Sequence, residues 1–196
     1  MREVEAKSLK QKIALGLLHA FGWKVIARDV PDKCVIIGYS HTSNWDFLFF
    51  VLARMAYGMN LSYLAKAEIF RFGAGPVLKA LGGIPVDRSA AQGVVGEAVA
   101  MFGRMPELRL AISPEGTRKR TEYFKSGFYH IAIGAGVPLL LAALDFGTRT
   151  IDIGPAIALT GDAKADMNAI RARYEGVRGY HPEKMGVLRM RDEDAG

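Results

Sequence analysis

The most informative segment of the chain is Cys34-Val-Ile-Ile-Gly-Tyr-Ser-His-Thr-Ser-Asn-Trp-Asp46. It opens with a short apolar run, which is typical of a buried strand, and it ends where a helical pattern begins. Four residues separate His41 from Asp46. A single turn of chain of that length can bring the aspartate back beside the histidine as the helix starts, so we expect the two side chains to meet.

Strand-like and helix-like segments alternate along the rest of the chain. Apolar runs predict strands at 25–27, 35–39, 61–65, 84–87, 108–113, 139–144 and 150–153. Helical spacing predicts helices at 46–57, 76–80, 91–105, 127–135 and 163–174. This alternation is typical of a layered α/β fold, in which helices flank a central, largely parallel sheet. The sequence contains no internal repeat, low-complexity tract or Gly/Ser linker, so residues 25–196 are expected to form a single domain.

Composition and charge narrow the class of protein. A chain of 196 residues, 50% of them hydrophobic, is long enough to bury the core of one domain. The net charge of +6 and the pI near 9.5 favour an anionic partner, such as a phospholipid headgroup or a phosphorylated substrate. Nucleic acid is a poorer fit, because the basic residues are scattered and the sequence carries no RNA- or DNA-binding signature.

Cysteine and histidine give little sign of metal or redox chemistry. Cys34 is the only cysteine, which excludes an internal disulfide, and its apolar surroundings indicate a buried thiol rather than a nucleophile. His19, His130 and His181 lack metal-ligand spacing to a second histidine or cysteine, so we predict no metal site. Without a disulfide, an intracellular location is the default expectation.

Residues 1–24 form a separate feature. Three lysines precede a short apolar run at 13–21, and Trp23 follows it. The sequence lacks the small-residue cleavage site of a signal peptide, and the run is shorter than the ~20 residues that a membrane-spanning helix needs. Two interpretations stay open: an amphipathic helix that anchors the protein in the membrane interface, or an ordinary first helix packed on the core.

The pairing of His41 with Asp46 has a chemical use. A carboxylate beside an imidazole fixes its tautomer and raises its basicity, so the free ring nitrogen can take a proton from a hydroxyl nucleophile. The alternative is structural: His41 caps the following helix, and Asp46 binds backbone amides at its first turn. The spacing by itself does not decide between the two.

Three further segments strengthen the chemical interpretation: Gly82-Gly-Ile-Pro-Val-Asp-Arg88, Ser113-Pro-Glu-Gly-Thr-Arg118 and Val137-Pro-Leu-Leu-Leu141. His41, Arg88 and Glu115 each come just after a predicted strand. Because sites in α/β folds gather at the carboxyl ends of the strands, one site can collect all three. The leucines of the last segment form either a plain core strand or a contact with an acyl chain.

The identity, order and spacing of these four segments, from residue 38 to residue 145, resemble those of the glycerolipid acyltransferase family. The resemblance implies transfer of a fatty acyl group from acyl-CoA or acyl-carrier protein to the hydroxyl of a lysophospholipid, with 1-acylglycerol-3-phosphate as the leading acceptor. It implies an enzyme of phospholipid biosynthesis that needs no cofactor. Such an enzyme works at the membrane surface, attached peripherally to the cytoplasmic side of a bacterial-type cell membrane.

The resemblance also implies roles for individual residues. His41 is the general base on the acceptor hydroxyl, and Asp46 holds its tautomer. Because the substrate supplies the hydroxyl, the reaction needs no protein nucleophile. Glu115 either orients Arg118 or accepts a hydrogen bond from the acceptor, while the alternative for Arg88 is simple charge balance with Asp87. The residues implied in binding the acceptor are Arg88, Glu115, Gly116, Thr117 and Arg118.

Three other functions stay open. The acceptor can be another lyso-lipid, such as a lyso-aminolipid, because related enzymes with the same segments use them. Water in place of the acceptor would give a thioesterase or lipid hydrolase, although the chain has no Gly-x-Ser-x-Gly nucleophile motif. A non-catalytic lipid-binding protein would keep the sheet and the basic residues without needing the His41–Asp46 pair.

Overall fold

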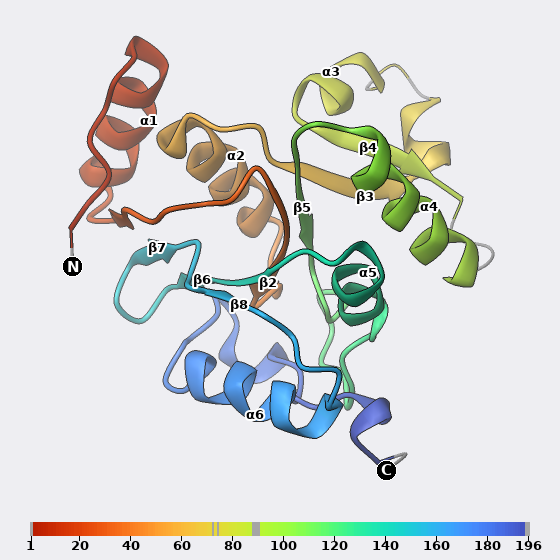
Figure 1. Ribbon diagram of the computed structural model, residues 1–196. Helices are drawn as coiled ribbons and strands as arrows, with labels where there is room; N and C mark the ends of the chain where they lie inside the picture. Colours follow the sequence, from red (N-terminus) through yellow and green to blue (C-terminus); the bar gives the residue numbers. More distant parts are fainter. Residues whose placement is uncertain (1, 72, 74, 88–90, 195–196) are drawn as a thin grey trace.

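The computed structural model describes residues 2–71, 73, 75–87 and 91–194. Within these residues an eight-stranded sheet forms the centre of the molecule, in the order β1-β7-β6-β2-β5-β3-β4, with β8 paired to β6 (Figure 1). The strands are β1 (Lys24–Ile26), β2 (Lys33–Tyr39), β3 (Ser62–Lys66), β4 (Gly83–Val86), β5 (Leu108–Ile112), β6 (Leu139–Asp145), β7 (Thr150–Asp152) and β8 (Ala156–Ile157).

The central strands of the sheet run parallel. β2 pairs in parallel with β5 on one side and with β6 on the other, and β3 pairs in parallel with β5 and β4. β7 and β8 run antiparallel to β6. The predicted α/β fold with a largely parallel sheet is therefore confirmed, and the loops that follow the parallel strands leave the sheet at one edge.

Helices cover both faces of the sheet. α4, α5 and α6 pack on one face, and α1 and α2 pack on the other (Figure 1). The α-helices are α1 (Leu9–Ala20), α2 (Trp45–Tyr57), α3 (Gly75–Ala80), α4 (Ala91–Arg104), α5 (Gly127–Ala135) and α6 (Ala163–Tyr174). Short 3-10 turns are η1 (Ala67–Phe70), η2 (Pro182–Lys184) and η3 (Arg191–Asp194).

The sequence of β2 explains the two layers. Alternate side chains of a strand point to opposite faces of the sheet. Val35 and Ile37 pack with α4, α5 and α6, whereas Cys34 and Ile36 pack on the side of α2. All four are buried, and a fully buried aliphatic side chain contributes about 1.5–3 kcal/mol to stability. A strand that is apolar on both faces belongs in the middle of a parallel sheet.

The helix α1 has one buried and one exposed apolar face. Its buried face packs against α2 and contributes Ala14, Leu15 and Leu18. Its other face carries an apolar residue at every fourth position: Leu9, Ile13, Leu17 and Phe21, the last at the C-cap. The interpretation as a helix packed on the core is right for the first face. None of the helices in the described parts of the chain is long and apolar enough to cross a membrane.

Two features differ from the sequence prediction. The helix α1 begins at Leu9, before the apolar run, because the Ser8 hydroxyl accepts a hydrogen bond from the Gln11 N–H and caps the first turn. The strand β8 is absent from the predicted strands, because its two residues are too few to show a strand period.

The burial of Cys34 has a measurable consequence. Its side chain is inaccessible to solvent, and burial raises the pKa of the thiol to about 12. Because the thiolate is the nucleophile, we expect iodoacetamide at about pH 8 to leave the folded protein unmodified and to alkylate the unfolded protein readily. Mass spectrometry of protein sampled over time measures the labelling. Rapid labelling without denaturant would contradict the placement of β2 inside the sheet.

Candidate active site

The two motif loops lie side by side because the strands before them are neighbours. β2 ends at Tyr39 and β5 ends at Ile112, and the two strands pair in parallel with Ile37 opposite Ile112. The loops at 40–44 and 113–117 therefore leave the same edge of the sheet. As expected from the sequence, this arrangement brings the first and third motif segments together.

His41 and Asp46 are in contact. Asp46 lies on the first turn of α2, and its Oδ2 is 3.2 Å from Nδ1 of His41. The aspartate side chain is 6% exposed, whereas that of the histidine is 29% exposed. Among the residues that the structure describes, none hydrogen-bonds the Nε2 atom of His41. A carboxylate on Nδ1 and an open Nε2 are the arrangement that a general base requires.

Asp46 also binds the backbone of the loop before it. Its Oδ2 accepts hydrogen bonds from the N–H groups of Thr42 (2.7 Å) and Ser43 (2.8 Å). These two amides lie in the loop before α2 and not in its first turn, so Asp46 binds backbone amides at another place than the structural alternative expects, and it contacts His41 at the same time. Because the loop backbone and the imidazole contact the same oxygen, the Asp46 carboxylate fixes the position of the loop and the orientation of the His41 ring.

Glu115 is buried beneath the loop and bonded on both oxygens. Its Oε2 accepts a 2.6 Å hydrogen bond from the His41 N–H, and its Oε1 accepts a 3.1 Å bond from the Gly186 N–H. Burial raises the pKa of this carboxyl group, and the two N–H donors partly offset the rise. No hydrogen bond joins Glu115 to Arg118 in the described part of the chain, whereas Glu115 does hold the loop at 40–44 through the His41 N–H.

The segment after Glu115 forms an exposed turn. The Gly116 N–H donates to the Ser113 carbonyl, and Gly116 has a φ of 63°, a left-handed conformation that favours glycine. Arg118 follows on the surface, and no described residue pairs with its guanidinium. The side chain of Lys125 lies over Gly116, close enough that a Cβ there would be 3.0 Å from Nζ. The turn thus presents cations to solvent next to Glu115, which is bonded to the loop that carries His41.

The second and fourth motif segments add no described side chain to the site. Arg88 lies outside the described residues, so its role in binding the acceptor stays a prediction. The leucines at 139–141 are almost completely buried at the start of β6, as expected for a core strand.

Several residues near the site have contacts that the sequence does not predict. Thr42 is 2% exposed and accepts a hydrogen bond from the His181 N–H, while Gly186 bonds to Glu115. Lys125 follows the third motif by seven positions. Thr42 lies within the first motif segment, but the motif itself gives it no role, and Gly186 and Lys125 belong to no recognisable motif. Their contacts join distant parts of the chain.

The sequence model of the Acyltransferase family matches residues 24–144, which is more than half of the chain. The chain belongs to the Acyltransferase family. It is an enzyme that transfers acyl groups, so the predicted class, an O-acyltransferase, is confirmed.

A solved structure has the same fold. It is the crystal structure of the 1-acyl-sn-glycerophosphate (LPA) acyltransferase PlsC from Thermotoga maritima, with a TM-score of 0.59 and 17% sequence identity. The match covers 85% of this chain and 76% of that one. At this identity the likeness concerns the fold alone. Comparison with curated protein sequences gives no match.

The described residues also bear on metal binding. Among them, no group of three or more histidine, cysteine, aspartate or glutamate side chains is arranged to hold a metal ion.

The His41–Asp46 contact predicts the effect of two substitutions. His41→Ala removes the base, and Asp46→Asn removes the charge that holds its tautomer, so we expect each to lower kcat by about 10²–10⁴-fold. Initial rates of acyl transfer measure the loss, and circular dichroism verifies the fold. The control is His130→Ala, because His130 also pairs with an aspartate, Asp192, at 3.0 Å on the surface. Full activity of His41→Ala would rule out the assigned base.

Proposed function

We propose that the enzyme transfers a fatty acyl group from acyl-CoA or acyl-carrier protein to the free hydroxyl of a lysophospholipid, with 1-acylglycerol-3-phosphate as the first candidate. The observation that carries the proposal is the open Nε2 of His41 beside an exposed cationic turn. The two are linked through Glu115, which touches the His41 backbone and precedes Gly116 in the chain.

The reaction needs only the two substrates and one proton carrier. Nε2 of His41 takes the proton from the acceptor hydroxyl as its oxygen attacks the thioester carbonyl carbon. The tetrahedral intermediate then breaks the carbon–sulfur bond, and the leaving thiolate receives the proton from the imidazolium. Asp46 stabilises that imidazolium through Nδ1. One ester forms, one thioester is broken, and the histidine returns to its starting state.

The cationic turn suits a phosphate group on the acceptor. Arg118 can form two parallel hydrogen bonds to phosphate oxygens, and Thr117 can add a hydroxyl donor. Lys125 contributes a further positive charge beside Gly116. Arg88 is proposed to join this set as the sequence resemblance implies. A phosphomonoester carries enough negative charge to engage several of these groups together.

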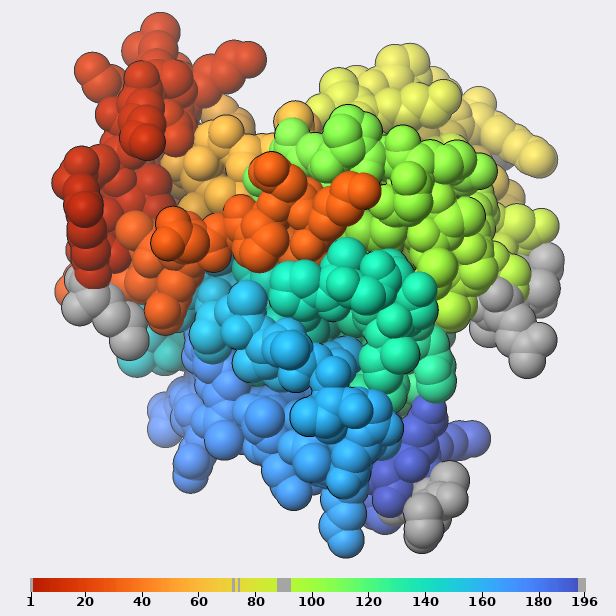
Figure 2. All heavy atoms as spheres, in the orientation of Figure 1, coloured from red at the N-terminus to blue at the C-terminus, as the bar shows by residue number. Residues whose placement is uncertain are grey.

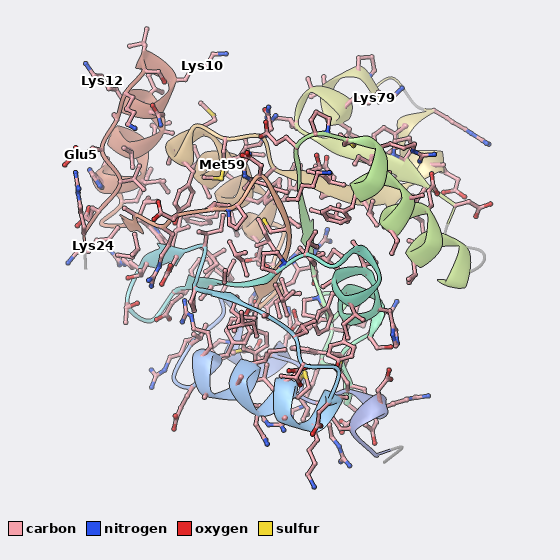
Figure 3. The ribbon with its side chains drawn as sticks, in the orientation of Figure 1. Glu5, Lys10, Lys12, Lys24, Met59 and Lys79 are labelled. Carbon is pink, nitrogen blue, oxygen red and sulfur yellow. The ribbon has the colours of Figure 1, made fainter. Side chains whose placement is uncertain are left out.

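The exposed face of α1 suits a membrane surface. The helix projects from one corner of the molecule (Figure 2), and its side chains Leu9 and Phe21 are 73% and 71% exposed. Lys10 and Lys12 point outward from the same helix (Figure 3). An apolar stripe with lysines beside it is typical of helices that lie in the interface of anionic membranes. We propose that this face attaches the enzyme peripherally to the inner side of the cell membrane, where its acceptor resides.

Exposed aromatic and aliphatic side chains also lie next to the loop at 40–44, which we call the catalytic loop. Trp45 and Leu48, on the first turn of α2, are 54% and 44% exposed. Phe47 and Phe50 form an aromatic cluster with Tyr63 of β3. We propose that the acyl chains of the substrates contact this apolar surface, because a lipid acceptor must bring its hydroxyl to His41 without leaving its chain in water.

The proposed acceptor is tested with a panel of lysolipids. Purified enzyme is incubated with labelled acyl-CoA and each acceptor, and mass spectrometry identifies the products. We expect phosphatidic acid to dominate, and we expect Arg118→Ala to lower kcat/KM for 1-acylglycerol-3-phosphate by about 10- to 100-fold, because charged hydrogen bonds to the phosphate are lost. With monoacylglycerol, which lacks phosphate, the same variant should show little change.

The matched control for this experiment is Arg104→Ala. Arg104 is also exposed, but it is the last residue of α4, shortly before β5 begins. It therefore lies at the edge of the sheet where β5 starts, opposite to the edge that carries the site. If Arg118→Ala and Arg104→Ala lower kcat/KM equally, the loss is caused by the change in net charge and not by a contact of Arg118 with the phosphate. If free fatty acid is the main product with every acceptor, the enzyme is a hydrolase and the proposed acyl transfer is wrong. If the enzyme prefers an acceptor without phosphate, the proposed role of Arg118 is wrong.

The membrane face is tested by vesicle sedimentation. We expect the enzyme to bind vesicles containing phosphatidylglycerol more strongly than vesicles of phosphatidylcholine, because the lysines of α1 favour anionic lipid. Ile13→Asn should weaken binding about tenfold, since its side chain no longer enters the apolar layer. The control is Ile133→Asn, an isoleucine of similar exposure (44% against 50%) on α5. Equal binding of the two variants would contradict the proposed face.

A further inference from the structure

The last part of the chain returns across the catalytic loop. α6 ends at Tyr174, whose hydroxyl donates hydrogen bonds to the backbone carbonyls of Ile37 in β2 and Ala142 in β6. Beyond it, residues 178–190, which we call the C-terminal strap, form hydrogen bonds at the carboxyl ends of β2, β5 and β6. The family match ends at residue 144, so the strap lies outside the matched region.

Backbone groups of the strap bond to the catalytic loop and to its support. The His181 N–H donates to Thr42 Oγ1 at 3.1 Å, and the Gly186 N–H donates to Glu115 Oε1 at 3.1 Å. The other oxygen of Glu115 accepts from the His41 N–H. One buried carboxylate therefore joins the strap to the backbone of the catalytic histidine.

The strap can approach the catalytic loop and Glu115 closely because two of its residues are glycine. A Cβ at Gly179 would overlap the Ser40 hydroxyl and lie 3.1 Å from Thr42 Oγ1. A Cβ at Gly186 would lie 3.2 Å from Cγ of Glu115. Since Ser40 immediately precedes His41, any adjustment to a larger residue in the strap is transmitted to the catalytic loop.

We propose that the C-terminal strap is a positioning element of the acyl-transfer reaction, which holds His41 in place through Thr42 and Glu115. The proposal rests on the proposed role of His41 as the base. The strap acts through the loop and not on the substrates, so damage to it lowers kcat and leaves the KM values unchanged. A purely structural segment would instead lower the melting temperature without this split between kcat and KM.

The decisive variant is Gly179→Ala, measured with and without Ser40→Ala. We expect Gly179→Ala to lower kcat by about 10- to 100-fold, because a shift of about 1 Å at a reacting group can cost a factor of that size. Ser40→Ala removes the overlapping hydroxyl, which has no hydrogen-bond partner in the described structure. In that background the effect of Gly179→Ala should largely disappear, which a double-mutant cycle quantifies. The control is Gly96→Ala in α4, where a Cβ meets nothing within 4 Å.

A second readout does not depend on activity. The His41 amide proton, bonded to Glu115 at 2.6 Å, gives an NMR signal that reports the position of the loop. We expect this signal to move in Gly179→Ala and to return in the double variant. Glu115→Gln should move it as well, because an amide NH2 would then face a backbone N–H, and its KM for the acceptor should stay unchanged.

The possible results distinguish a failure of the strap proposal from a failure of the proposed acyl transfer. Additive effects of the two alanine substitutions, or an unmoved His41 amide signal in Gly179→Ala, would overturn the positioning role. A raised acceptor KM in Glu115→Gln with an unmoved signal would assign Glu115 to substrate binding instead. If the unmodified enzyme acylates no lysolipid, the proposed function fails, whereas the NMR measurement still decides the role of the strap.

Discussion

One carboxylate oxygen organises the site. Asp46 Oδ2 lies 3.2 Å from Nδ1 of His41 and accepts hydrogen bonds from the N–H groups of Thr42 and Ser43. Because this oxygen is buried, protein donors rather than water balance its charge. Asp46 belongs to the first turn of α2, and α2 packs on the sheet. The orientation of the imidazole is therefore tied to the hydrophobic core and not left to a free loop.

The carboxylates of the site are buried, whereas its cations are exposed. Asp46 and Glu115 are buried and are occupied by the loop that carries His41. Gly116 to Arg118 continue from Glu115 to the surface, where the cations are open to a ligand. The raised pKa of Glu115 means that it takes up a proton at higher pH than an exposed glutamate does. Protonation would replace an acceptor with a donor and release one of the two backbone N–H groups that it holds.

The fold and the centre of the site could largely be predicted from the sequence, because both depend on local patterns. Apolar runs such as 35–39 carry the strand signal, and parallel pairing then brings the ends of β2 and β5 together. The spacing of His41 and Asp46 gives their contact directly. The double attachment of Glu115 could not be predicted, since Gly186 lies 71 residues further along the chain. The nearness of Gly179 to Ser40 likewise exists only in the folded protein.

We propose that Asp46 keeps His41 in the tautomer with hydrogen on Nδ1, so that Nε2 is free to accept a proton. The most direct test is ¹⁵N NMR of the imidazole ring in enzyme labelled at histidine, with His41→Ala used to assign its signals. We expect a protonated Nδ1 and an unprotonated Nε2 for neutral His41. In Asp46→Asn, this preference should weaken or reverse. A native His41 with hydrogen on Nε2 would contradict the assigned base, because that nitrogen would have no lone pair to offer the acceptor hydroxyl.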